Sequence, residues 1–196
     1  MDPKTIALIE GHPDPAGGHL CHALGDAYAQ GAEASGFTVH RLALSRLDIP
    51  LIRTKDEFES APPQDSDIAR AQAQLAQAQH WVFVYPLWLG TMPALLKAFL
   101  EQVTRGGFAL TVNPEGVPKP GLKGHTARVV ITMGMPAFAF RLMFGAASLK
   151  TLQSGILGFA WVRPVRATLI GGVDGLSPNK AELWLERVRA LGREGR

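Results

Sequence analysis

The sequence predicts an α/β fold: a doubly wound, five-stranded parallel sheet in the order 2-1-3-4-5, with helices on both faces. Apolar and β-branched runs recur along the chain and are typical of strands buried on both faces. Amphipathic stretches of helical length separate these runs, which favours parallel strands joined by right-handed crossovers. No internal repeat and no linker interrupts the 196 residues, so we expect residues 1–196 to form a single domain.

The first part of the chain predicts two strands with a loop and a helix between them. Thr5–Glu10 is the first buried strand, and Gly11–Gly18 (GHPDPAGG) is a turn-rich loop. A helix follows and ends at Gly36. Phe37–Leu42 alternates apolar and polar residues, as a half-exposed edge strand does. The inner face of the helix is made of Leu20, Ala23, Leu24, Ala27 and Tyr28.

The middle of the chain contains the expected central strand. Ser45–Pro63 has no periodicity and predicts irregular chain at the surface. Ser66 or Asp65 is a suitable cap for a second helix. The unbroken aromatic and β-branched run that starts at Trp81 predicts the central strand, and Pro93 begins a third helix. Residues expected to face inward from these two helices are Ile68, Ala71, Leu75, Ala78, Leu95, Leu96, Phe99, Leu100 and Val103.

The last part of the chain supplies the remaining two strands. Residues 104–124 are rich in Gly and Pro and predict an excursion or a hairpin. Ala127–Thr132 is the fourth strand, followed by an unusually apolar loop at Met133–Gly145. We expect a helix at Ser148–Trp161 and the fifth strand at Val165–Ile170. The final helix starts at Ser177 and Pro178, and its apolar positions are Trp184, Val188 and Leu191.

Composition limits the class of protein. A chain that is 46% hydrophobic and 19% charged has enough apolar residues for a substantial core. The single cysteine, Cys21, excludes an internal disulfide and suits a reducing cytoplasm. No apolar stretch reaches the roughly 18 residues of a membrane span, and we expect no signal peptide and no membrane insertion. The net charge of +3 is spread along the chain, so we expect no nucleic-acid partner.

Three loops should open on one edge of this sheet, at residues 11–20, 85–92 and 132–145. Ligands of open α/β sheets bind at that edge, near the point where the strand order reverses. The first loop leads into a helix N-terminus, which can bind phosphate. Gly17 and Gly18 let the backbone approach the phosphate closely, and His19 could add a side-chain donor; an ordinary strand–helix turn is the alternative. The second loop exposes leucine and tryptophan, which suits a planar ring system; packing under residues 104–124 is the alternative.

The third loop carries Met135, Phe138 and Phe140, followed by Met143 and Phe144. An apolar patch of this kind is normally an interface or a ligand site. The alternative is a buried amphipathic helix.

Several other site classes are disfavoured. GHPDPAGG contains neither a P-loop nor a G-x-G-x-x-G motif, which argues against an ATPase or a Rossmann dehydrogenase. His12, His19 and His22 are clustered, but they lack partners at metal-ligand spacing, so we expect no metal. Cys21 lies at an expected helix start, which lowers a thiol pKa, yet no base is nearby and a small buried side chain is the favoured role. No G-x-S-x-G elbow is present.

At this point the residues resemble a known family. PLWLGTMPALLKAFLEQV is similar to the flavin-ring loop and helix of the flavodoxin-fold NAD(P)H:quinone oxidoreductases. The resemblance covers nearly the whole chain, and the central motif is specific. Weaker matches follow in the family's order: His12-Pro13, Gly107-Phe108-Ala109, Leu122-Lys123-Gly124 and Thr132-Met133-Gly134.

The resemblance implies a flavin site made by the three loops. The flavin phosphate would rest on the first loop and helix start, and the isoalloxazine ring against the second loop with its pyrimidine edge on the third. The family works as a homodimer in which the neighbouring subunit completes each site. The implied cofactor-binding residues are His12, Gly17, Gly18, His19, Leu20, Cys21, Pro86, Leu87, Trp88, Leu89, Thr132, Met133 and Gly134.

Two positions depart from the family pattern. Relatives often carry a Ser near the phosphate, whereas the matching stretch here reads His19, Leu20, Cys21 and has no hydroxyl anchor. Relatives also tend to place a Tyr after the Thr-x-Gly turn, whereas Phe140 stands about there and has no proton to donate. The resemblance implies that the anionic reduced flavin ring is stabilised by backbone N–H groups around Gly134, by Arg141, or by His125 reaching across a subunit boundary.

The implied activity is a two-electron flavin reductase. NAD(P)H would deliver hydride to bound FMN, with FAD as the alternative, and leave; a quinone or similar flat acceptor would then take its place in a ping-pong cycle. No protein nucleophile and no metal is needed. Two other functions stay open: an ancillary subunit of a potassium-efflux transporter, as some relatives are, and a one-electron carrier of the flavodoxin type.

Overall fold

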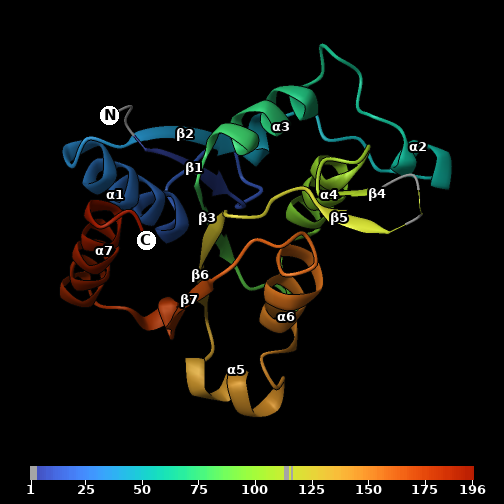
Figure 1. Ribbon diagram of the computed structural model, residues 1–196. Helices are drawn as coiled ribbons and strands as arrows, with labels where there is room; N and C mark the ends of the chain where they lie inside the picture. Colours follow the sequence, from blue (N-terminus) through green and yellow to red (C-terminus); the bar gives the residue numbers. More distant parts are fainter. Residues whose placement is uncertain (1–3, 113–114, 116) are drawn as a thin grey trace.

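The computed structural model describes residues 4–112, 115 and 117–196. Its main sheet has five strands in the order β2-β1-β3-β6-β7, and all four neighbouring pairs are parallel. The predicted order 2-1-3-4-5 is therefore confirmed (Figure 1). The strands are β1 (Thr5–Glu10), β2 (Thr38–Ala43), β3 (His80–Pro86), β6 (Thr126–Met133) and β7 (Val165–Gly171).

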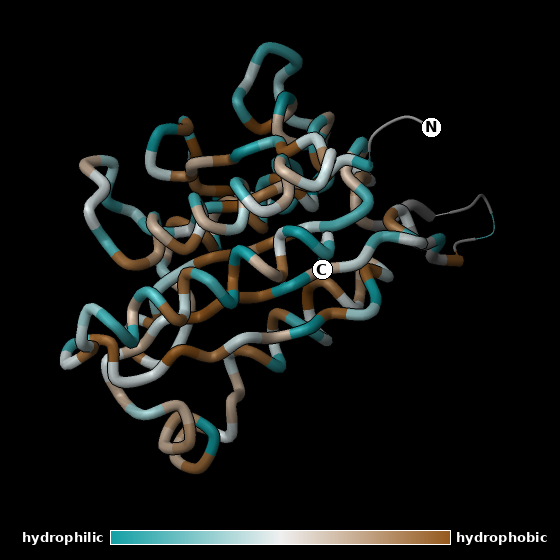
Figure 2. The backbone as a smooth tube through the Cα atoms, turned by 90° about the vertical axis from the view of Figure 1, so that its left-hand side faces the viewer, coloured by the Kyte–Doolittle hydropathy of each residue, from teal (hydrophilic) through white to brown (hydrophobic). Residues whose placement is uncertain are grey.

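The central strand divides the hydrophobic core into two layers. Trp81, Phe83 and Tyr85 of β3 point to one face of the sheet, and Val82 and Val84 point to the other. This alternation follows from the two-residue repeat of a strand, and burial on both faces explains the unbroken apolar run. Figure 2 shows the most hydrophobic stretches of backbone running through the middle of the molecule.

Helices cover both faces. The Trp81 face packs against α3 (Asp67–Gln77), α4 (Ala94–Thr104) and α6 (Ala147–Lys150), the last continuing as a π-helix at Thr151–Leu157. The Val82 face packs against α1 (Leu20–Ala34) and α7 (Pro178–Arg193). In Figure 1 these two helices lie side by side, on the opposite side of the sheet from α3 and α4.

The residues that the sequence predicts to begin or end helices are found at the helix ends. The Ser66 hydroxyl accepts from the Ala69 N–H and caps α3, which decides between the two predicted caps. Ser177 is the N-cap of α7, and Pro178 occupies its first turn. Beyond α1 the chain turns at Gly36 with φ +82°, where the Phe37 N–H reaches the Ala32 carbonyl.

Two expected irregular segments contain helices. The loop predicted at 133–145 includes α5 (Ala137–Met143), which starts directly after Pro136. Only Phe140 of α5 is buried, so its sequence has too little apolar periodicity to identify a helix. The segment predicted to be irregular at 45–63 has a 3₁₀ turn at Leu44–Arg46 and α2 (Lys55–Glu59), which buries no residue.

The excursion at 104–124 contains the predicted hairpin. β4 (Leu110–Val112) and β5 (Pro118–Pro120) pair antiparallel and form a separate two-stranded sheet. The stretch between them includes residues 113, 114 and 116, which lie outside the described residues. This hairpin stands apart from the five-stranded sheet.

Candidate functional site

Two cavities meet at the carboxyl-terminal edge of the sheet. The first, about 270 Å³, lies between the loops that follow β1, β3 and β6. The second, about 590 Å³, lies between the start of α1 and the end of β2. Both volumes are ordinary for a small-molecule site or part of one. His12 lines both cavities, so its imidazole is the wall that they share.

The structure brings most of the predicted site residues to these cavities. The first cavity is lined by residues from all three predicted loops: His12, His19, Leu20, Cys21, Pro86, Leu87, Trp88, Thr132, Met133 and Gly134. Gly17 and Gly18 line the second cavity, each with φ +78° and nothing within 4 Å of the position that a Cβ would take. Leu89 lines neither of these two cavities; its side chain is fully exposed at the tip of a turn.

A tight turn holds Trp88 half exposed beside the first cavity. Trp88 and Thr91 exchange two backbone hydrogen bonds of 2.9 Å, and Leu89 and Gly90 between them have φ +48° and +76°. A two-residue turn with both φ positive closes a hairpin, and its first residue is strained here because it is not glycine. Trp88 is 48% exposed, so it is not buried under the excursion, whereas Leu87 packs partly against the core.

The end of β6 forms the opposite wall. The Leu87 N–H donates to the Thr132 carbonyl at 2.7 Å, which ties the second loop to the third. A Cβ on Gly134 would lie 2.3 Å from the Asp174 carboxylate, so any side chain at this position would have to displace that carboxylate. Thr132 Oγ1 lies 3.1 Å from Cys21 Sγ. Burial raises the pKa of the Cys21 thiol to about 11 and outweighs the influence of the helix start, so the thiol stays protonated and inert.

Three imidazoles crowd the first loop. The rings of His12 and His19 stack with their centroids 4.0 Å apart, and that of His22 lies 5.0 Å from His12 and 5.6 Å from His19. His19 Nε2 is 2.8 Å from the carboxylate of Asp14, and this hydrogen bond is the main cause that lowers the Asp14 pKa. The pKa of His12 is lowered by burial first and then by the charges of the other two imidazoles. In the described residues no group of three or more His, Cys, Asp or Glu is placed to hold a metal ion.

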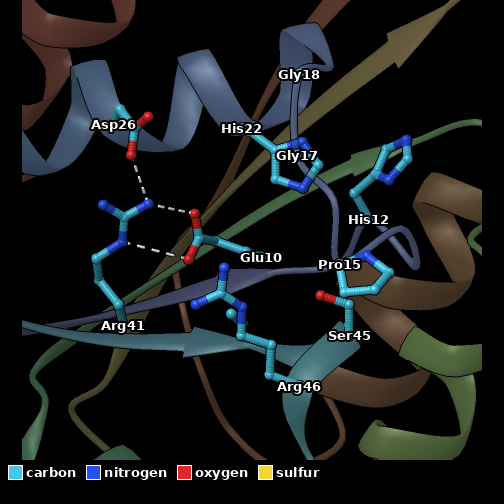
Figure 3. A pocket seen from close by; sticks show the side chains of 11 residues that line it. Glu10, His12, Pro15, Gly17, Gly18, His22, Asp26, Arg41, Ser45 and Arg46 are labelled. Carbon is cyan, nitrogen blue, oxygen red and sulfur yellow. Dashed lines mark hydrogen bonds and ion pairs between the residues drawn. The ribbon is translucent and has the colours of Figure 1, made fainter.

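An ion-pair network that sequence reasoning missed closes the second cavity. Arg41 of β2 reaches Glu10 at 2.5 Å and Asp26 of α1 at 2.7 Å, as the dashed lines in Figure 3 show. The two carboxylates raise the already high pKa of Arg41. Ser45 and Arg46 line the same cavity. The only sequence signal was a charged residue in each of two adjacent parallel strands, Glu10 at the end of β1 and Arg41 in the second half of β2.

Three further predicted residues lie away from the first cavity. The Phe140 ring is fully buried in the core, whereas Arg141 is exposed on α5. His125 precedes β6, so it is at the opposite end of the sheet, where its ring lies 5.6 Å from that of Trp81. A role for His125 in another subunit's site stays a prediction. Asp174 and Val173, from the turn after β7, line the first cavity and were not predicted.

The described residues contain no helix long and apolar enough to cross a bilayer.

The patch predicted after β6 is largely exposed: Phe138 and Met143 project from α5, and Phe144 follows it at 40% exposed. The buried amphipathic alternative for Met143 and Phe144 is therefore wrong.

The amino-acid sequence of this chain is similar to that of a quinone oxidoreductase and to that of an ancillary protein of a potassium-efflux system. The chain is 39% identical over 119 residues to the FMN-dependent NADH:quinone oxidoreductase of Bordetella avium, covering 57% of each protein. It is 36% identical over 95 residues to the glutathione-regulated potassium-efflux system ancillary protein KefG of Cronobacter sakazakii, covering 48% of this chain and 49% of that one. The chain thus matches about half of the length of these two relatives.

The fold is shared with solved structures. The NAD(P)H:quinone oxidoreductase from Methanothermobacter marburgensis superimposes with a TM-score of 0.81 at 21% identity, covering 99% of this chain and all of that one. The family described as flavodoxin-like fold matches residues 4–191. The chain belongs to the flavodoxin-like fold family.

Proposed function

We propose that this protein is a flavin-dependent NAD(P)H oxidoreductase that holds FMN and reduces a quinone or a similar flat acceptor. The observation that carries the proposal is the first cavity, where a half-exposed tryptophan and a phosphate-type loop face the same space. The relative named as an FMN-dependent NADH:quinone oxidoreductase supports FMN rather than FAD.

The phosphate side of the cavities fits a phosphorylated ligand. His12 is only 8% exposed, and its Nδ1 accepts a hydrogen bond from the Asp14 N–H at 3.2 Å, which holds the ring at the wall of both cavities. Gly17 and Gly18 lie in the left-handed region, and a loop in this conformation can turn backbone N–H groups toward an anion. The α1 N-terminus adds the positive end of the helix dipole.

The ring side fits a flat apolar group. Pro86, Leu87 and Trp88 offer an apolar wall, and Thr132–Gly134 offers backbone groups opposite it. Gly134 has no side chain, so a ring edge can approach its N–H closely. We infer that Pro86, Leu87, Trp88, Thr132, Met133 and Gly134 hold the isoalloxazine, and that His12 and Gly17 through Cys21 hold the ribityl phosphate.

Bound FMN would supply the hydride chemistry itself. The chain's own residues bind and orient it: the Trp88 turn fixes one edge of the site, and the buried β3 and β6 ends exclude water from beneath the ring. Trp88 is half exposed at the side of the first cavity, and we infer that one flat molecule at a time stacks there. We infer that NAD(P)H and the acceptor occupy this place in turn, which gives ping-pong kinetics.

A second subunit would complete the site in this proposal. Phe138, Leu142 and Met143 expose a set of large apolar side chains on α5. Gly90 of the Trp88 turn lies against the ring of Phe144, so this apolar surface is continuous with the turn beside the cavity. A homodimer that buries the α5 surface would therefore also cover the open side of the first cavity.

The first test is the visible spectrum of the purified protein, followed by release of the bound cofactor and its identification by mass. We expect a yellow protein carrying FMN, and steady-state NADH or NADPH oxidation that depends on an added quinone. Trp88→Ala should weaken FMN binding by about tenfold, because the aromatic contact is lost. A colourless protein that takes up neither FMN nor FAD would contradict the proposal.

The similarity to KefG favours a second candidate, an ancillary subunit of a potassium-efflux system. Such a subunit could hold the same flavin in the same cavity and use the α5 surface to contact a transporter. Turnover by the isolated protein separates the two functions. Quinone-dependent NAD(P)H oxidation supports the enzyme, whereas bound flavin with no turnover favours the ancillary role.

A further inference from the structure

The turn after β7 places a carboxylate at the wall of the first cavity. Residues Val173–Gly175 form a 3₁₀ turn, and both Val173 and Asp174 line that cavity. Among the described residues that line it, Asp174 is the only one with a carboxyl group. No described residue forms a hydrogen bond or an ion pair with the Asp174 side chain. Its two carboxylate oxygens are therefore free to accept hydrogen bonds from a ligand.

Two contacts hold this turn against the end of β6. Gly172 has φ +69°, and its N–H donates to the Met135 carbonyl at 3.1 Å. Val173 packs partly against the hydrophobic core. The Asp174 carboxylate consequently lies beside Gly134, where an added Cβ would be 2.3 Å from Oδ2 and 3.5 Å from Oδ1. The absence of a side chain at Gly134 thus leaves room for this carboxylate.

The backbone next to the carboxylate offers a donor. Gly134 directly follows β6, and its N–H makes no hydrogen bond within the part of the chain that the structure describes. A carboxylate is only an acceptor and an amide N–H only a donor, so a ligand that meets both needs a donor beside an acceptor along one edge. The imide edge of a ring has this pattern, because its N–H lies between two carbonyl groups.

We propose that Asp174 accepts a hydrogen bond from the imide N–H of the flavin, at N3, and that its charge lowers the reduction potential of the bound flavin. The proposal rests on the function proposed above, in which this edge of FMN lies at Thr132–Gly134. The Gly134 N–H would donate to a carbonyl of the same edge. A negative charge at this place repels the reduced flavin ring, which is anionic, more than the neutral oxidised ring.

The first experiment compares FMN with N3-methyl-FMN, in which a methyl group replaces the imide hydrogen. Both ligands are titrated into the flavin-free full-length protein and followed by flavin fluorescence. We expect the wild type to bind N3-methyl-FMN at least about 30-fold more weakly than FMN, because a charge-assisted hydrogen bond is lost. Equal dissociation constants for the two ligands would overturn the proposal.

Asp174→Ala tests whether this discrimination comes from the carboxylate. Asp174 is exposed in a turn, and no described residue is hydrogen-bonded to its side chain, so the variant should fold. We expect the variant to bind FMN about tenfold more weakly and to distinguish the two ligands by less than about threefold. Discrimination as strong as that of the wild type would refute the role of Asp174.

Asp174→Asn separates charge from hydrogen bonding, because the amide oxygen can still accept from the imide N–H. Spectroelectrochemical titration of the FMN-loaded protein measures the midpoint potential of the bound flavin. We expect the ratio of the dissociation constants of reduced and oxidised FMN to fall about tenfold, which raises the potential of this two-electron couple by about 30 mV. An unchanged potential would refute the electrostatic effect.

Asp56→Asn is the matched control, since it makes the same change of charge on α2, which lines neither cavity. It should leave both the discrimination and the potential as in the wild type. An equal rise in potential in this control would assign the effect to net charge and would also refute the proposal. If FMN binds but the Asp174 variants behave like the wild type, only the role of Asp174 fails. If the wild type binds no FMN, the proposed function fails, and the role of Asp174 fails with it.

Discussion

At the scale of single residues, burial decides the chemistry of the titratable groups in this chain. Cys21 is kept protonated because its thiol is buried against Thr132, although it lies at a helix start. His80, the first residue of β3, has its pKa lowered to about 4 by burial, and secondarily by the positive charges of Arg128 and Arg166. Its Nδ1 lies 2.7 Å from Thr126 Oγ1, and its Nε2 is buried without a partner. His80 is therefore neutral in the folded protein and has no acceptor ready for a second proton.

This environment predicts acid sensitivity. The unfolded chain binds a proton at His80 near pH 6.5, whereas the folded chain resists it down to about pH 4. Stability should be unaffected by this group above pH 6.5, and it should fall between these two values by roughly 2–3 kcal/mol. Urea unfolding of the wild type and of His80→Gln at several pH values measures the effect. Identical pH dependence in the two proteins would show that His80 does not contribute.

At the scale of elements, glycines set the distance between α1 and α7. A Cβ on Gly31 would lie 2.0 Å from the Arg189 carbonyl oxygen, and one on Gly192 would lie 2.1 Å from that of Tyr28. The two helix backbones are therefore in direct contact. Because α1 also begins at the loop that lines both cavities, this contact helps to fix the orientation of α1 relative to the candidate site. Sequence periodicity predicted both helices but not their close approach, since it does not report which residues of one helix face the other.

We expect Gly31→Ala to destabilise the protein by about 2–3 kcal/mol, because the added methyl group must push the two backbones apart. Gly155→Ala is the matched control: it is also helical, and its Cβ would meet only a side-chain atom of Thr151 at 3.8 Å. That control should change stability by less than about 1 kcal/mol. Equal denaturation midpoints for the two variants in urea would contradict this account of the α1–α7 contact.

At the scale of the whole molecule, α5 is a helix whose large apolar side chains are mostly left uncovered by the rest of the fold. Phe138 and Leu142 are 67% and 80% exposed, while Phe140 of the same helix is fully buried. Figure 1 shows α5 standing out from the body of the molecule. Large exposed apolar side chains on such an element mark an interaction surface. A second copy of this chain is the occupant that we expect.

Phe138→Glu combined with Leu142→Glu should convert the dimer to a monomer, because charged side chains cannot be buried unpaired in an apolar interface. Lys150→Glu, an exposed position on the neighbouring helix, is the control and should leave the dimer intact. Sedimentation velocity measures both. A monomeric wild-type protein, or a variant that remains dimeric, would rule out the α5 surface as the interface.

The sequence by itself determined the five strands, their order, and the convergence of three loops at one edge, because strand periodicity and crossover geometry are local or general rules. It also identified most of the residues that line the first cavity, although not Val173 and Asp174; it placed the start of the last helix at Ser177 and left the cap of α3 open between Asp65 and Ser66. Only the tertiary structure decided that α5 is a helix, that Leu89 is fully exposed and lines neither cavity, and that Glu10, Asp26 and Arg41 form one network. Each of these features depends on contacts between residues that are far apart in the sequence, and local sequence patterns carry no information about such contacts.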